Sequence, residues 1–236
     1  MKLLNVRSNP KVPVAGSPIT VTASTSRLLA GQRVLLQRRM YSTYWENLSA
    51  VTVGRSGAIT ATLRQAEVGR KDYRFELVAT ASHPRTAASV PGFTVFKWFP
   101  LAEYESLYTK TIGGQFHASA PGWELTGPNG TYSEHNISLG GKCREFKSTV
   151  GIWDGHADPG LAAQFVLLTP SGARAVSGAV REGSAVKVSA DVRGWSRLGM
   201  RTVKRAPESV VGTGAWGSPL ALCSQEPSYL GYSYGG

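Results

Sequence analysis

The sequence predicts an all-β fold of two β-sandwich domains, the second a jelly-roll sandwich, joined by a short linker helix. Its 236 residues exceed the roughly 100 to 200 of one ordinary domain. Short runs rich in β-branched and aromatic residues recur along the chain, and 27 glycines and 13 prolines supply turns between them. With 42% hydrophobic residues, the chain has enough apolar material for a packed core and is not expected to be disordered.

The first domain is predicted over residues 1–98. In ITVTAS, residues 19–24, Ile19, Val21 and Ala23 alternate with threonine and serine, which indicates a strand with one buried face and one wet face. Similar runs lie at 33–39, 50–53, 58–64, 73–80 and 93–98. Six or seven such strands in about 95 residues are typical of a β-sandwich.

A more specific pattern runs through this domain. Its residues are Gly31, Val34 to Arg38, Trp45, Gly57, Gly69 and the pair Tyr73-Arg74. The pattern resembles the immunoglobulin-like domains of bacterial surface and phage proteins. The resemblance implies that the strand leucines and Trp45 fill the core between the sheets, and that the domain serves as a spacer or docking module.

The pattern changes near residue 100. Pro100 closes the last strand, and Leu101, Tyr104, Leu107 and Tyr108 recur at helical spacing, which predicts a linker with a short helix over 99–111. Strand-like runs resume in a second domain predicted over 112–225. The last residues, EPSYLGYSYGG at 226–236, are predicted to form a tail rich in glycine, serine and tyrosine.

Four segments of the second domain share one order and spacing. They are LGGKCREFKSTVGIWDG, AAQFVLLTPSGARAVSG, AVKVSADVRGWSRLGMRTV and GAWGSPLALCS, within residues 112–224. Together they resemble the NPCBM family, whose name stands for novel putative carbohydrate-binding module. The resemblance implies a β-sandwich in which Phe146 and Val150 face the core and Trp153-Asp154 lead into a loop that touches ligand.

The chain has two cysteines, Cys143 and Cys223. Two cysteines alone make no zinc cluster, so a disulfide, two buried thiols or two unrelated thiols remain. Cys143 begins a strand and Cys223 ends one, so adjacent strands would bring them together. In an extracellular setting we expect a disulfide, which would stabilise the fold by about 4 kcal/mol on the loop-entropy model.

A glycan site needs exposed aromatic rings beside polar side chains, because sugars present both C–H faces and hydroxyl groups. Trp195, in the turn RGWSR, is the best candidate for an exposed ring, whereas Trp153 and Trp216 are more often core residues at such strand-edge positions. In the loop WDGHADPG, turn formation alone explains the aspartates, and a ligand or cation role is the alternative. The predicted ligand-binding residues are Trp195, Asp154, His156, Asp158, Trp153 and Trp123, with His135 as a further polar candidate.

No catalytic signature is present. The sequence lacks G-x-S-x-G, HExxH and a P-loop, its four histidines are scattered, and its acids offer no obvious pair for glycoside hydrolysis. We therefore expect no enzyme activity and no cofactor, with a structural cation as the one alternative. Residues 1–97 hold 14 Lys and Arg against 4 Asp and Glu, and residues 98–236 hold 12 against 11. The basic first half is expected to dock on an acidic surface, but it lacks the aromatic platform or recognition helix of a nucleic-acid binder.

The sequence thus predicts a non-catalytic protein that binds cell-envelope glycan. The apolar runs are far shorter than the roughly 18 to 20 residues of a membrane span, and the first residues lack the apolar core of a secretory signal. Because an exported binder would need such a signal, we expect a phage virion component, a minor tail or decoration protein in an oligomeric assembly, located in the virion or outside the cell. The alternatives are an architectural virion protein without sugar binding and a module of a secreted actinobacterial protein.

Overall fold

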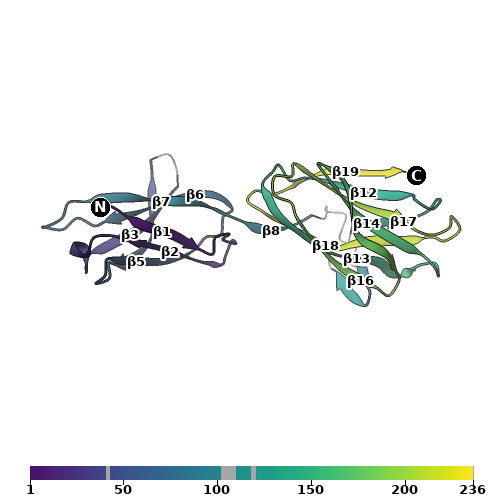
Figure 1. The fold of residues 1–236 in the computed structure, drawn as a ribbon, viewed down its shortest axis with the longest axis horizontal. Coiled ribbons are helices and arrows are strands. Elements are labelled where there is room, and N and C mark those ends of the chain that lie inside the picture. Colours follow the sequence, from purple (N-terminus) through teal and green to yellow (C-terminus); the bar gives the residue numbers. More distant parts are fainter. Residues whose placement is uncertain (41–42, 102–109, 118–120, 236) are drawn as a thin grey trace. The chain divides into compact units, whose positions relative to one another are not determined.

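The chain is an all-β protein in two compact units, Met1–Lys97 and Trp98–Gly236, as seen in a computed structural model (Figure 1). The structure describes residues 1–40, 43–101, 110–117 and 121–235. Within these ranges every regular element is a strand except one short 3-10 helix, η1 (Arg27–Leu29). The all-β prediction is confirmed, and none of the described residues belongs to a helix of the length and apolar character that a membrane span requires.

The first unit is a sandwich of two antiparallel sheets. One sheet has three strands in the order β1-β2-β5, and the other has four in the order β4-β3-β6-β7. Seven strands in two sheets agree with the strand number of an immunoglobulin-like sandwich, and the family resemblance of this unit stays a prediction. The strands are β1 (Leu4–Asn9), β2 (Pro18–Ser24), β3 (Arg33–Arg39), β4 (Trp45–Thr52), β5 (Ala58–Arg64), β6 (Gly69–Leu77) and β7 (Thr86–Val95).

The core of this unit follows the predicted alternation. Ile19, Val21 and Ala23 of β2 are buried, and they face aromatic and aliphatic residues of the other sheet. Tyr73 and Phe93 stack there with ring centroids 4.6 Å apart. Alternate residues of β2 and β5 therefore enter one core, which they share with buried residues of β3, β6 and β7, and such a shared core stabilises a sandwich.

The expectation that Trp45 fills this core is wrong. Trp45 pairs with Arg39 across β4 and β3 and is only half-buried, outside the buried core. Its ring lies 4.3 Å from the guanidinium carbon of Arg74 and 5.9 Å from that of Arg39. Trp45 shares the polar outer face of the sheet with these arginines, so the indole makes cation–π contacts there while Tyr73 and Phe75 fill the core.

The second unit also consists of two sheets. In one, the order is β10-β9-β13-β18-β11, with β16 paired to β13 and β8 paired to β18; in the other it is β15-β14-β17-β12-β19. The shorter strands are β8 (Lys97–Pro100), β9 (Lys110–Ile112), β10 (Gln115–His117) and β11 (Gly122–Glu124). The longer strands are β12 (Tyr132–Ser138), β13 (Cys143–Ala157), β14 (Ala162–Thr169), β15 (Gly172–Arg181), β16 (Ala185–Asp191), β17 (Arg197–Lys204), β18 (Gly212–Cys223) and β19 (Ser228–Gly235).

The two segments predicted as linker (99–111) and tail (226–236) both contribute strands to the second unit. The start of the expected linker forms β8, which pairs with β18, and the Leu101 N–H donates to the Pro219 carbonyl at 2.9 Å. The predicted helix falls on residues 102–109, which lie outside the described residues. The tail at 226–236 contains β19, which pairs with β12, because Tyr229 and Tyr232 pack on rings of the second unit.

A group of large rings fills the centre of the second unit. Trp216 of β18 is fully buried and contacts Phe146 and Phe165, with ring centroids 6.0 and 5.4 Å away. Its indole N–H donates to Thr202 Oγ1 at 3.1 Å, so the polar atom of the ring is satisfied inside the core. Phe146 and Val150 are also buried, as the sequence predicted, and Trp216 is a core residue.

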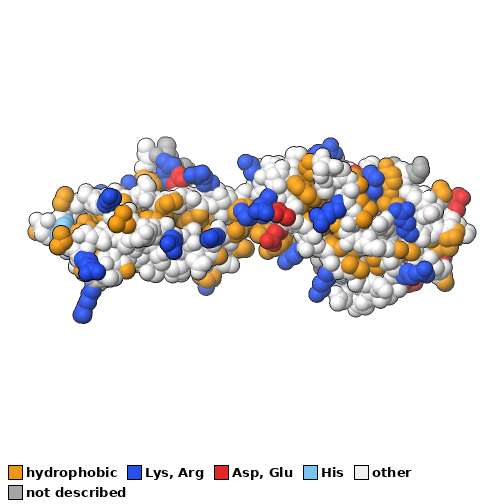
Figure 2. Space-filling model, in the orientation of Figure 1, with side chains coloured by type: hydrophobic (Ala, Val, Ile, Leu, Met, Phe, Trp, Pro, Cys, Tyr) orange, Lys and Arg blue, Asp and Glu red, His pale blue; other side chains and the backbone are white. Residues whose placement is uncertain are grey.

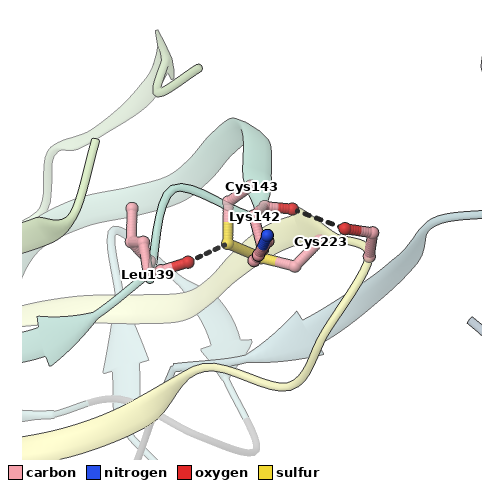
Figure 3. Close-up of a disulfide and its surroundings, with 5 residues drawn as sticks. Leu139, Lys142, Cys143 and Cys223 are labelled. Atoms are coloured by element: carbon pink, nitrogen blue, oxygen red, sulfur yellow. Dashed lines mark hydrogen bonds between the residues drawn. A yellow bond between two sulfur atoms is a disulfide. The ribbon is translucent and has the colours of Figure 1, made fainter. Parts of the chain in front are cut away.

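The two cysteines form a disulfide between β13 and β18 (Figure 3). Cys143 and Cys223 face each other in the register of these strands, and both are buried. Beside them, the Ser224 N–H donates to the Lys142 carbonyl at 3.0 Å, which extends the strand pairing past the bridge. The predicted disulfide is confirmed.

Replacing both cysteines by serine should lower the free energy of unfolding by about 4 kcal/mol, because the bridge closes a loop with a sequence separation of 80 and limits the unfolded chain. Urea unfolding of the oxidised protein and of the double variant Cys143→Ser, Cys223→Ser measures the difference. Adding a reductant to the wild type should give a similar loss and should leave the double variant unchanged. Equal midpoints for oxidised and reduced wild type would contradict the expectation.

Candidate functional site

The candidate site is a group of rings near the C-terminal end of β13. Trp153 and His156 stack there with ring centroids 3.5 Å apart and an interplanar angle of 23°. Trp153 is half-buried and His156 is exposed, so the histidine is the solvent-facing ring of the pair. The backbone of Trp153 pairs with Ile112 of β9, which fixes the position of the indole.

Lys110 of β9 lies against this pair. Its ammonium nitrogen is 5.2 Å from the centroid of the Trp153 ring, a cation–π geometry. Only 6% of the lysine is exposed, and burial lowers its pKa from the ordinary value. The charge therefore sits where the protein has removed most of its water.

A second pair of rings adjoins Lys110. The Trp123 indole N–H donates to His135 Nε2 at 2.8 Å, and the Tyr232 ring packs on Trp123 at 5.0 Å between centroids. Burial lowers the pKa of His135 to about 4, and the positive charge of Lys110 adds to this effect. His135 is thus neutral at pH 7. We call Lys110, Trp123, His135, Trp153 and His156 the ring cluster.

Two of the predicted ligand residues shape the backbone. The carboxylate of Asp154 accepts hydrogen bonds from the N–H groups of Gly113 at 3.1 Å and Gly114 at 2.8 Å. Both glycines have positive φ in the turn between β9 and β10, so Asp154 stabilises a turn that a side chain would strain. Asp158 accepts the Val211 N–H at 2.9 Å in the same way. Both carboxylates thus bind the backbone of segments distant in sequence, and not a turn of their own loop.

Trp195 lies away from the ring cluster. It occupies the turn between β16 and β17, where its carbonyl accepts the Gly141 N–H at 3.0 Å just before β13 begins. Trp153 is ten residues beyond Cys143 on the same strand, roughly 30 Å at about 3.3 Å per residue. The structure brings Trp123, Trp153 and His156 together around Lys110 and leaves Trp195 at the other end of β13.

Lys110 and Tyr232 were missed in the sequence. Lys110 belongs to the short strand β9, within the residues predicted as linker, and Tyr232 belongs to the segment predicted as tail. Neither lies in a local motif, because each reaches the ring cluster through long-range strand pairing, of β9 with β13 and of β19 with β12. Among the described residues no group of three His, Cys, Asp or Glu side chains could hold a metal ion.

The geometry of the ring cluster suits an uncharged, partly apolar ligand. The Trp153–His156 stack offers a ring surface on which C–H groups can pack, and strand pairing holds its position. The buried Lys110 contacts the Trp153 ring of this stack, and its charge also acts on His135, which accepts the Trp123 indole N–H.

The free energy of unfolding should fall by about 3 kcal/mol as the pH drops from about 6.5 to about 4 through His135 alone. The pKa of His135 is lower in the folded state than in the unfolded state, so between these two values the unfolded chain binds one more proton than the folded chain and is favoured as the pH falls. Above about pH 6.5 His135 is neutral in both states, and the full stability is present. Urea unfolding at pH 7 and pH 4.5 should show a flatter dependence for His135→Gln, which keeps an acceptor for Trp123. His156→Gln, at an exposed position, is the matched control and should keep the steep dependence; equal slopes for wild type and His135→Gln would refute the assignment.

Comparison with known families gives one match. Residues 130–220 match the NPCBM/NEW2 domain family. This segment contains β12 to β17 and most of β18, the strand that pairs with β13. No curated protein matches the chain.

The similar solved structures include two from ZmpB of Clostridium perfringens. One contains the M60 catalytic domain with the CBM51-1 and CBM51-2 domains, at 11% identity and a TM-score of 0.42, covering 94% of this chain and 31% of that chain. The other contains CBM51-2 in complex with GlcNAc and INT domains, at 11% identity and a TM-score of 0.31, covering 88% of this chain and 48% of that chain. This chain spans less than half the length of each.

The family match falls on the residues whose pattern predicted it. The four segments that resemble NPCBM form strands β13 to β18 of one sandwich, and the family model covers nearly all of them. The second unit of the chain therefore carries a carbohydrate-binding-module-like domain that resembles the NPCBM/NEW2 family.

Proposed function

We propose that the second unit binds a neutral glycan without catalysis, through the exposed side of the ring cluster. The observation that carries the proposal is the Trp153–His156 stack, with its exposed outer ring, in a domain that matches the NPCBM/NEW2 family. A pyranose ring would pack its C–H face on His156 and on the edge of Trp153. Its hydroxyl groups would exchange hydrogen bonds with water and with polar groups at the rim.

Rigidity supports this assignment. Trp153 is fixed by backbone pairing with Ile112, and Asp154 anchors the adjoining turn through Gly113 and Gly114. A ring pair that is already ordered loses little side-chain entropy when ligand binds. The site therefore gains affinity from preorganisation and needs few direct polar contacts.

The first unit fits a spacer or docking role. Lys and Arg side chains are spread over the face of this unit seen in Figure 2, and this basic character is compatible with an acidic neighbouring surface, whose attraction would be sensitive to salt. Attachment to host cells as part of a virion stays a prediction, as does an extracellular location. If no glycan binds in the following experiment, the result would favour the architectural role without sugar binding.

A printed array of neutral and N-acetylated glycans, followed by titration calorimetry on the best ligand, tests the proposal. His156→Ala should weaken binding about fivefold to tenfold, because it removes the exposed ring of the stack. Trp195→Ala is the matched control at the far end of β13 and should bind like the wild type.

Two outcomes would overturn the assignment. Loss of binding in Trp195→Ala with normal binding in His156→Ala would move the site to the turn between β16 and β17. Absence of binding by the intact, correctly bridged protein across the array would favour the architectural role. Thermal unfolding of each variant checks that the substitutions leave the fold intact.

A further inference from the structure

A second candidate site is a groove along β13 and β16 of the second unit. This groove of about 840 Å³ is formed by side chains of β8, β13, β15, β16 and the turn after β16. All of its lining residues belong to the second unit, and none belongs to the ring cluster. Its charged lining residues are Arg144, Lys147, Arg174, Arg193, Glu145 and Asp191.

The groove carries more positive than negative charge. Arg193 and Asp191 form a pair in which the guanidinium Nε lies 2.8 and 2.9 Å from the two carboxylate oxygens. The hydrogen bonds from Arg193, with a further contribution from the charge of Arg144, lower the pKa of Asp191 to about 2. Among the ion pairs of the described residues, neither Lys147 nor Arg174 has an acidic partner.

Trp98 holds one of these two cations in place. The Lys147 ammonium lies 4.0 Å from the centroid of the indole, within cation–π distance. Trp98 itself is half-buried on β8, a strand that pairs with β18. This contact holds the Lys147 ammonium over the Trp98 ring at the edge of the groove and limits the motion of the lysine side chain.

The backbone positions both cations from regular strands. Lys147 pairs with Ser189 of β16 on one side and Leu220 of β18 on the other. Arg174 pairs with Leu167 in the opposite sheet, at the edge strand β15. Two cations from different sheets thus face one groove, and a planar guanidinium matches a carboxylate or phosphate with two parallel hydrogen bonds.

We propose that this groove binds the anionic groups of a glycan, carboxylate or phosphate, with Lys147 and Arg174 as the direct contacts. The half-buried Trp98 and the exposed Ser189 favour a sugar polymer over a nucleic acid or an acidic peptide. A sugar acid can place a C–H face near the indole edge and a hydroxyl group on the serine while its anion reaches the bases. A single ring gives no series of stacking platforms for nucleic-acid bases.

The test uses the full chain and three soluble polymers, with affinity measured by calorimetry at low and physiological salt. Polygalacturonate supplies carboxylate, a glycerol-phosphate polymer supplies phosphate, and fully methyl-esterified polygalacturonate is the uncharged match. Binding to either anionic polymer, with no binding to the ester, supports the proposal and identifies the anion. Binding of the ester as tight as that of polygalacturonate, or binding to neither anionic polymer, would overturn it.

Variants then locate the contact. Lys147→Gln and Arg174→Gln should each weaken binding of the anionic polymer at least about tenfold, because each removes a charge-assisted hydrogen bond. Lys187→Gln is the matched control: it is exposed on β16, outside the groove lining, and should bind like the wild type. An equal loss in Lys187→Gln would indicate general attraction to a basic surface and would overturn the site.

Two further comparisons separate this proposal from others. Polyglutamate at matched charge should bind more weakly than the glycan, and equal or tighter binding would point to an acidic protein instead. His156→Ala should leave binding of the anionic polymer unchanged, since the ring cluster shares no residue with the groove. The experiments can therefore show neutral-glycan binding by the ring cluster without anion binding by the groove, or anion binding without neutral-glycan binding, so the two proposals are tested separately.

Discussion

The pairing of β13 with β18 is the constraint on which the rest of the second unit depends. It places Phe146 and Val150 of β13 beside the buried Trp216 of β18, and the bridge between Cys143 and Cys223 closes its end. The outward side chains of the same strand are then fixed as well. Lys147 lines the groove, and Trp153, six residues further along β13, belongs to the ring cluster. One strand thus connects the core to both proposed sites, so disruption of the pairing would disturb both.

Alternation along the strands predicted most of the fold, because every second residue of a half-buried strand must be apolar. It predicted the inward set of β2, whereas the buried positions Phe146 and Val150 were expected from the resemblance to the NPCBM family. It failed where a residue's environment depends on a distant strand. Trp45 is apolar, yet it lies on a polar outer face beside Arg74. The start of the linker and the tail become strands because β18 and β12 have edges free to pair with them.

The residue types of the candidate site were predictable, but their partners were not. The aromatic and histidine residues in WDGHADPG indicated a ligand surface, and Trp153 and His156 do stack. The aspartates in the same loop accept hydrogen bonds from backbone N–H groups of distant segments, a role that a local turn does not predict. Lys110 joins from a strand over forty positions earlier, and burial, which no local pattern reports, decides the protonation of His135.

Lys110 and Lys147 show why two sites on one domain can select different ligands. Each ammonium lies over a tryptophan ring, at 5.2 Å for Lys110 and 4.0 Å for Lys147. Lys110 is almost fully buried, and its lowered pKa reflects the cost of holding a charge without water. Lys147 is exposed, so its charge is open to solvent. Under the two proposals, the same side chain over the same kind of ring supports the surface for a neutral sugar in one place and contacts an anion in the other, and the two lysines differ in burial.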